Sequence, residues 1–275
     1  MGVWVIAELT LREAARRKIL WAALLLGLAF LTLYGFGLHL MLTGPAAQAA
    51  ALERREGTNA LLIVGLYAVN FLMVMMTVLT SVDTLPGEIA SGIIQSIAIK
   101  PVNRWEVVFG KWLGFVAMLT LYILLMAGGV LVLTEVLAGY TAHNVVPGLG
   151  LMWMEGLLLL SMTLLWGTRF STLATGVLTF GLHGLAFIGG WIEEFGALSH
   201  SQAAVKLGVV TSLIMPSEAL WRRAASEMQS PVVNALGVSP FGGASVPSTA
   251  MVIYAGLFLI ATFSLALRRF SRKDL

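Results

Sequence analysis

The chain contains no cysteine and very little charge. With no cysteine among its 275 residues, a disulfide framework, a zinc ribbon, an iron–sulfur cluster and a thiol nucleophile are all excluded. Charged residues make up 11% of the chain, whereas soluble globular domains average about 25%. A chain this poor in charge cannot cover a surface that faces water, which excludes a soluble enzyme, a disordered tail and a coiled coil.

What the chain does have is apolar residues. Hydrophobic types account for 58% of the sequence and the mean hydropathy is +0.89, so most of the chain is expected to be surrounded by lipid. The net charge is +3, and the basic residues are dispersed. Such a distribution does not provide the basic surface that nucleic-acid binding requires, so we expect no nucleic-acid partner.

Six stretches are long and apolar enough to form transmembrane helices, each of which needs about 20 mostly apolar residues. The first is not followed by a small-residue cleavage site, so we expect it to be a permanent span. The sequence therefore predicts an all-α membrane protein with a single transmembrane domain over 1–275. The predicted spans cover residues 19–42, 60–82, 107–134, 148–167, 171–192 and 249–267.

The distribution of lysine and arginine predicts the orientation. Six spans place both termini on one side, and twelve of the 17 basic residues lie on that side, against five on the other. Because loops rich in Lys and Arg remain in the cytoplasm, both termini are expected to be cytoplasmic, in the inner membrane of the cell. The excess of basic residues on the side of the termini also agrees with an even number of spans.

Residues 1–18 are expected to form an interfacial helix in the headgroup layer. Trp4, Ala7, Leu11 and Ala14 share one helical face, with the basic residues on the other. Glu8 precedes Arg12 by four residues, which is a favourable helical ion pair. The alternative is an ordinary basic flank that only sets the orientation of the first span.

The sequence of residues 83–106, which we expect on the cytoplasmic side, predicts two short helices joined by a bend, called the elbow below. Pro86 suits the first turn of a helix, and isoleucines then recur every four residues, with polar Glu88 and Gln95 on another face. Asn103 followed by Glu106 has the pattern of a capping box that starts the next helix. The elbow is interpreted either as a docking surface for a cytoplasmic partner or as a segment lying on the membrane surface.

The stretch 193–248 lies on the outer side and is not expected to be disordered. It contains two apolar runs, 205–215 and 218–225, that are too short to span a membrane, and prolines punctuate it. Apolar segments of about 10–14 residues in a membrane protein are typical of re-entrant or interfacial pieces. We therefore expect two short outer helices that dip partly into the membrane.

The motifs of several enzyme classes are missing from the sequence. The one Gly-Lys pair, Gly110-Lys111, is followed by Trp112, so there is no phosphate-binding P-loop. There is no HExxH and no GxSxG motif, and the four histidines are scattered singly. We therefore expect no catalytic residues, no metal site and no cofactor on this chain, and favour a transporter component or a scaffold over an enzyme.

Taken together, these parts resemble the permease subunit of an ABC-2 type transporter. The branch that the chain most resembles includes permeases for the maturation of multicopper enzymes such as nitrous-oxide reductase. The passages that carry the resemblance are ELTLREAARR at 8–17, DTLPGEIASG at 83–92, KPVNR at 100–104 and LIMPSEALW at 213–221.

This resemblance implies a dimer of two permease copies with two separate ATPase subunits, which bind ATP and magnesium and account for the missing P-loop. It implies that the elbow at 83–106 is the coupling helix, that the second and fifth spans line the translocation pathway, and that the outer helices cover it. The residues it assigns to ATPase coupling are Glu88, Ile89, Ile93, Gln95, Lys100, Arg104, Arg12 and Arg16.

Polar and aromatic residues inside the spans are candidates for lining the pathway, since ionisable groups are costly in lipid. Glu155 is one, unless it sits at the membrane interface. His183 shares a helical face with Phe180 and Phe187, which is read either as a core stripe or as a pathway-facing patch. Asn70 either links helices or lines the pathway.

Two other functions remain open at this stage. One is a standalone secondary transporter or channel, although the six spans show no convincing internal repeat and no carboxylate-rich ion path. The other is a membrane scaffold that moves nothing. The leading expectation is the membrane half of an ATP-driven exporter.

Overall fold

A computed structural model describes residues 2–44, 50–91, 103–232 and 245–272. Within these ranges 88% of the residues are helical and there is no strand, which confirms the all-α expectation. The described helices are α1 (Gly2–Arg16), α2 (Lys18–Thr43), α3 (Ala51–Ser81), α4 (Thr84–Ala90), α6 (Arg104–Ala138), α7 (Val145–Gly167), α8 (Thr172–Leu198), α9 (Gln202–Ile214), α10 (Ser217–Met228) and α12 (Thr249–Ser271).

Six of these helices, α2, α3, α6, α7, α8 and α12, are long and apolar enough to cross a membrane, as the sequence predicts. Several run beyond the predicted limits, because helix continues into polar sequence at the ends of spans. α3 begins nine residues before the predicted start at Ala60, and α8 continues through Glu193 and Glu194 to Leu198. α6 ends at Ala138 and is followed by Gly139, which adopts the left-handed conformation (φ 63°) that favours glycine.

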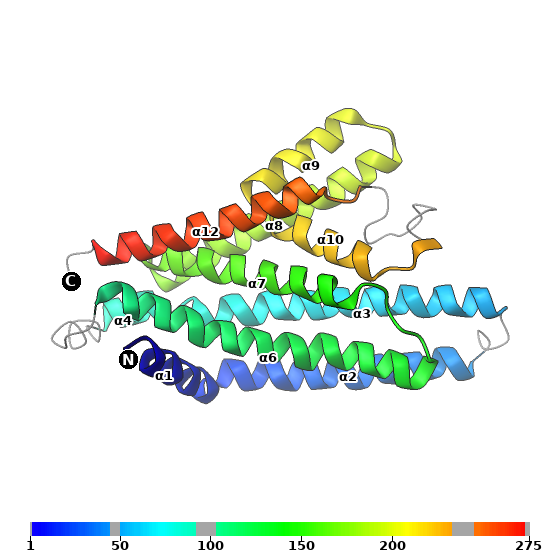
Figure 1. Cartoon of the computed structure of the whole chain (residues 1–275), viewed down its shortest axis with the longest axis horizontal. Coiled ribbons are helices and arrows are strands. Elements are labelled where there is room, and N and C mark those ends of the chain that lie inside the picture. Colours follow the sequence, from blue (N-terminus) through cyan, green and yellow to red (C-terminus); the bar gives the residue numbers. More distant parts are fainter. Residues whose placement is uncertain (1, 45–49, 92–102, 233–244, 273–275) are drawn as a thin grey trace.

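The long helices form a bundle in which α3 and α7 are the most buried spans, whereas α2 and α12 are the least buried. α7 packs against α3, α6, α8, α10 and α12, so it lies at the centre of the core. Both chain ends and α4 lie at one end of the bundle, and the end of α2 and the start of α3 lie at the other (Figure 1). Exposed leucines along α2 are compatible with a surface that faces lipid.

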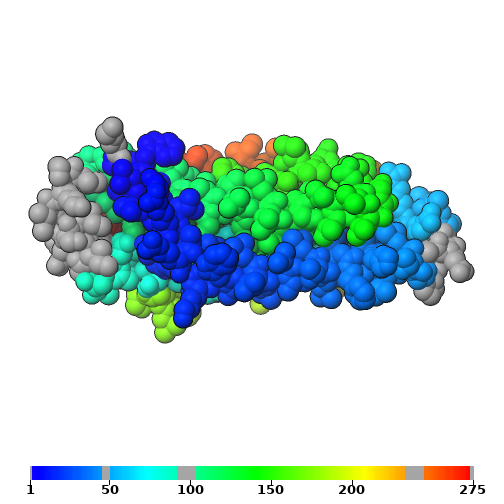
Figure 2. Space-filling model, turned by 90° about the horizontal axis from the view of Figure 1, so that it is seen from below, coloured from blue at the N-terminus to red at the C-terminus, as the bar shows by residue number. Residues whose placement is uncertain are grey.

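The N-terminal helix α1 crosses the end of the bundle at a steep angle to α2 (Figure 2). It packs on α6 where that helix has Gly110 and Gly114. A Cβ at Gly110 would lie 2.8 Å from Ile6 Cβ, and one at Gly114 would lie 2.8 Å from the Ala7 carbonyl oxygen. The two glycines therefore allow the close approach of the two helices.

The predicted apolar face of α1 is partly wrong. Ala7 and Ala14 are buried as expected, but the third buried position is Thr10, while Trp4 and Leu11 are exposed. Close packing on the glycines of α6 selects small side chains for the buried face, which places the large ones outside. The predicted ion pair between Glu8 and Arg12 forms, at 2.5 Å.

The start of α6 also differs from its prediction in detail. Asn103 is the N-cap, as expected, but its side chain accepts no backbone hydrogen bond. Instead its amide donates to the carboxylate of Glu106 over 2.8 Å. The two side chains satisfy one another rather than the free backbone N–H groups, so the helix starts where predicted without a capping box.

Two shorter helices follow the fifth span, as the apolar runs at 205–215 and 218–225 predict. α9 and α10 meet at an angle of 109°, at a break of the chain that contains Pro216. α9 packs closely on α8, where a Cβ at Gly208 would lie 2.4 Å from Glu193 Cβ. α10 packs on α7, where Gly148 makes room for Met228.

Candidate functional site

The short helix α4 is anchored to the bundle at the end that holds both termini. Leu85 and Pro86 are buried, and Pro86 fits against Gly167, where a Cβ would lie 3.1 Å from its Cδ. The hydroxyl of Thr172, at the start of α8, donates a hydrogen bond of 2.7 Å to the carboxylate of Asp83. Apolar packing and a hydrogen bond therefore connect α4 to two spans.

An ion pair between Glu88 and Lys111 adds a third connection, from α4 to α6. The side chains are only 15% and 5% exposed, respectively, so the pair lies mainly inside the protein. Glu88 is one of the residues expected to take part in ATPase coupling, and in the structure its charge is paired within the chain. Reasoning from sequence did not find Lys111 as its partner, because the two residues are 23 positions apart.

The other residues predicted to take part in coupling are distributed around this end. Ile89 is partly buried against the core, whereas Ile93, Gln95 and Lys100 lie outside the described residues. Arg12 is paired with Glu8 on the exposed side of α1, and Arg16 is exposed at the end of that helix. The remaining one is Arg104, the first residue of α6.

Inside the bundle, Asn70 on α3 and Glu155 on α7 are brought together. The Asn70 amide donates to a Glu155 carboxyl oxygen over 3.4 Å. Glu155 is fully buried, so its side chain lies in the interior of the bundle. Its second oxygen and the Asn70 carbonyl have no hydrogen-bond partner in the described structure, so this buried polar pair has unused hydrogen-bonding capacity.

The predicted face of α8 is half-buried. Nδ1 of His183 lies 2.9 Å from the Ser217 hydroxyl at the start of α10, so this histidine holds α10 against α8. Phe187 lies beside Tyr67, with 6.4 Å between ring centroids. Phe180 is also partly buried against the core. The stripe is thus partly core and partly surface.

The residues that sequence reasoning missed come mostly from α10. Glu218 is buried and interacts electrostatically with Glu155. Arg222 donates a hydrogen bond of 2.7 Å to Glu193 on α8. Ser245 donates to the other oxygen of Glu193 over 2.5 Å. One signal was available, since Glu218 and Arg222 stand four residues apart in α10 and therefore lie on the same side of the helix.

Glu155, Glu218, Glu193 and Glu194 are all buried, and Arg222 is the buried arginine among them. Such a concentration of charge within a bundle is costly and is typical of a functional region. Among the described residues, no group of three or more His, Asp or Glu side chains has the arrangement of a metal site. The candidate functional regions are therefore the anchored helix α4 and the polar cluster between α7, α8 and α10.

No protein-family model matches the chain, and no curated protein matches it.

Proposed function

We propose that this chain is the membrane-spanning permease subunit of an ATP-driven transporter of the ABC-2 type, and that it works as a dimer with two separate ATPase subunits. The observation that carries the proposal is the anchored helix α4, at the same end of the bundle as both termini (Figure 1). A chain that has no P-loop needs a partner to hydrolyse ATP, and a rigid element at the cytoplasmic end is what such a partner would move.

The anchoring of α4 suits the transmission of force. Movement of a floppy loop would be lost in local rearrangement, whereas α4 is tied to α8 through Asp83 and Thr172 and to α6 through Glu88 and Lys111. Displacing α4 would therefore displace two spans. In this proposal Glu88 positions the coupling helix, and other residues at this end of the bundle make the contacts with the ATPase.

The contact surface for the ATPase would include Arg104, Arg12 and Arg16 beside α4, together with Ile89 and the elbow residues Ile93, Gln95 and Lys100. α1 crosses this end of the bundle next to α6 (Figure 2), so its arginines supply a second contact with the same partner. ATP and magnesium would be bound entirely by the ATPase chains.

The second permease copy would pack along α8. Gly181 and Gly184 leave open space on this helix, since a Cβ at either would meet no atom within 4 Å. Val177 and Ile188 are exposed beside them, and small residues of this kind allow helices to approach closely in membranes. An α8–α8 interface would place His183, Phe180 and Phe187 next to the pathway between the copies.

Asn70 and Glu155 lie deeper, inside one copy. They would line the pathway only in a state in which α10 moves away from α7 and uncovers them. The bent pair α9–α10 is well placed for such a movement, because the chain breaks at Pro216 between the two helices. In this proposal α9 and α10 are re-entrant helices that cover the outer mouth of the pathway.

The proposal is tested by purifying the tagged chain from its native host in lipid nanodiscs and identifying the proteins bound to it in fixed ratio. We expect a P-loop ATPase in a two-to-two complex, with an ATPase rate that falls at least threefold when Arg104 is changed to Glu. Arg269→Glu, at the end of α12, is the matched control and should leave the ATPase rate unchanged.

A monomeric chain that transports alone would overturn the proposal in favour of a secondary transporter or channel. A chain that is neither bound to an ATPase nor able to transport would overturn it in favour of a scaffold.

A further inference from the structure

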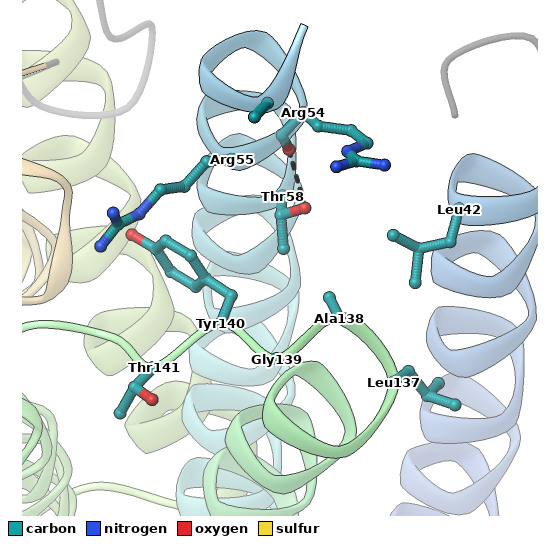
Figure 3. A pocket seen from close by; sticks show the side chains of 10 residues that line it. Leu42, Arg54, Arg55, Thr58, Leu137, Ala138, Gly139, Tyr140 and Thr141 are labelled. Carbon is teal, nitrogen blue, oxygen red and sulfur yellow. Dashed lines mark hydrogen bonds between the residues drawn. The ribbon is translucent and has the colours of Figure 1, made fainter. Parts of the chain in front are cut away.

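A cavity of about 610 Å³ lies at the end of the bundle opposite α4, between the end of α2, the start of α3 and the end of α6 (Figure 3). Most of its polar lining comes from one turn of α3 and from the segment after α6. Its lining includes both polar and apolar side chains, those of Leu42, Arg54, Arg55, Thr58, Leu137 and Tyr140.

The cavity carries positive charge from two neighbouring arginines. Arg54 extends toward α2 and Arg55 toward Tyr140 (Figure 3). Both side chains are exposed. The Arg55 guanidinium carbon lies 5.9 Å from the centroid of the Tyr140 ring, and Arg55 forms no ion pair with any described residue. Its N–H donors are therefore available to a ligand.

The acidic residues that flank the two arginines on α3, Glu53 and Glu56, do not line the cavity. The Glu56 carboxylate accepts a hydrogen bond of 3.1 Å from the Ser230 hydroxyl, so it is engaged with the segment after α10. Tyr140 is also held, because its hydroxyl donates to Asn59 over 2.9 Å. The Tyr140 ring is thus held in position, and the Arg55 guanidinium lies over its face.

The level of the arginines along α3 matches that of lipid phosphates. The apolar part of this span begins near Ala60, and Arg55 precedes it by five residues, or about 7.5 Å along a helix. That distance places both guanidinium groups in the headgroup layer, beyond the hydrocarbon core of about 30 Å. The sequence also keeps most basic residues at the opposite end, so a basic pair here is not explained by orientation.

The other side of the cavity is apolar. Leu42 on α2 and Leu137 on α6 line it, and Leu137 is 42% exposed. They lie at the ends of two spans whose lipid-facing surfaces continue toward the membrane centre. A ligand that fills the cavity would therefore meet cationic donors at one side and a hydrocarbon surface at the other.

We propose that this cavity binds an anionic phospholipid. The phosphate group accepts hydrogen bonds from Arg54 and Arg55, whose planar guanidinium groups suit the geometry of phosphate oxygens, and one acyl chain follows Leu42 and Leu137 along the surfaces of α2 and α6. The proposal does not depend on the transport function, since it rests only on the cavity, its charges and its level in the membrane.

The test measures lipid binding to the purified, delipidated chain by native mass spectrometry. Phosphatidylglycerol is compared with phosphatidylcholine, which has the same phosphate but no net charge. We expect phosphatidylglycerol to bind at least tenfold more tightly to the wild type. The double variant Arg54→Gln with Arg55→Gln should lose at least fivefold of that affinity. The matched control is Arg268→Gln with Arg269→Gln, an exposed arginine pair at the other end of the bundle, which should change it less than twofold.

A second variant separates a lipid site from a site for free phosphate. Leu137→Asp places a charge where the acyl chain would lie and leaves both arginines unchanged. For a lipid site, this variant loses phosphatidylglycerol binding, and inorganic phosphate at millimolar concentration does not compete with the lipid. Competition by inorganic phosphate together with unchanged binding to Leu137→Asp would overturn the lipid assignment. Equal binding of the two lipids, or equal losses in both arginine double variants, would overturn the site itself. Circular dichroism melting of each variant confirms that it is folded.

Discussion

Arg222 on α10 and Glu193 on α8 form an ion pair of 2.7 Å in which both side chains are more than nine-tenths buried. The second oxygen of Glu193 accepts a hydrogen bond from Ser245, and Arg222 also donates to the Ser245 carbonyl oxygen. The pair thus connects α8, α10 and the segment that leads into α12. It is a buried, charged link between the bent helices α9–α10 and the bundle.

Breaking this pair is expected to destabilise the protein clearly. Arg222→Gln leaves the Glu193 carboxylate buried without its partner, which typically costs about 3 kcal/mol or more. Arg223→Gln is the matched control, because the neighbouring pair of Arg223 and Glu227 is 30% and 21% exposed and such pairs contribute about 1 kcal/mol or less. Thermal unfolding in nanodiscs measures both. Equal losses in the two variants would contradict a structural role for the buried pair.

The ion pair of Glu88 and Lys111 predicts how α4 responds to a single change. Lys111→Met removes the partner of a carboxylate that is only 15% exposed, so α4 should detach more readily. We expect backbone amides of residues 84–91 to exchange hydrogen at least tenfold faster, which corresponds to about 1.4 kcal/mol of lost local stability. Glu106→Gln, a change to a residue near the same end, is the control and should leave exchange in α4 unchanged. Unaltered exchange in Lys111→Met would show that packing of Leu85 and Pro86 alone holds the helix.

The sequence predicts more of the fold than of the candidate sites. Spans are set by runs of apolar residues and helix starts by residues such as Ser171 and Ser248, whose hydroxyls accept backbone hydrogen bonds at the starts of α8 and α12. These signals are local, so the sequence contains them directly. The packed face of α1 was predicted only in part, because Gly110 and Gly114 on another helix decide which of its residues are buried.

The polar contacts depend on how distant segments come together, which no local pattern encodes. Asn70 and Glu155 were each identified as candidates, yet their hydrogen bond joins residues 85 positions apart. The partners Lys111 and Arg222 were not identified, since nothing beside Glu88 or Glu193 in the sequence points to them. α3 and α8 also run beyond their predicted limits because their polar ends pack against other helices, α3 against α10 and α8 against α9.

The contact of α1 with α6 predicts opposite effects for glycine replacements on the same helix. Gly114→Ala places a methyl group 2.8 Å from the Ala7 carbonyl oxygen, which should displace α1 at a cost of about 1–3 kcal/mol. Gly128→Ala meets no atom within 4 Å and should stabilise α6 by about 0.5–1 kcal/mol. Hydrogen exchange in residues 3–16 should rise only in Gly114→Ala. A rise in both, or in neither, would contradict the packing of α1 on these glycines.

The buried pair of Asn70 and Glu155 predicts that shape matters more than charge at position 155. Glu155→Gln keeps the size of the side chain and an oxygen that can accept from the Asn70 amide, so folded yield and melting temperature should change little, by about 1 kcal/mol or less. Asn70→Leu leaves the fully buried Glu155 carboxyl without its hydrogen bond and should cost about 1–3 kcal/mol. If Glu155→Gln fails to fold while Glu155→Asp folds, an ionised carboxylate is required and this prediction is wrong.

Tyr140, in the segment between α6 and α7, predicts a loss of stability at alkaline pH. Burial raises the pKa of its phenol above 10.0, the nearby Glu56 raises it further, and Arg55 opposes the shift. Because the folded state favours the neutral phenol, its contribution is complete below about pH 10. Above that pH the unfolded chain ionises first, so stability falls until the pH passes the pKa of the folded state.

The comparison that isolates this effect is the fall in melting temperature between pH 9 and pH 11. Tyr140→Phe should be less stable at pH 9, by about 1 kcal/mol, because the hydrogen bond to Asn59 is lost, but its fall between the two pH values should be smaller than that of the wild type. Tyr254→Phe also removes a phenol that donates a hydrogen bond, to the Leu213 carbonyl oxygen, and leaves Tyr140 in place. A reduction confined to Tyr140→Phe assigns the difference to the buried phenol beside Arg55, whereas equal falls in Tyr140→Phe and the wild type would show that Tyr140 does not titrate in this range.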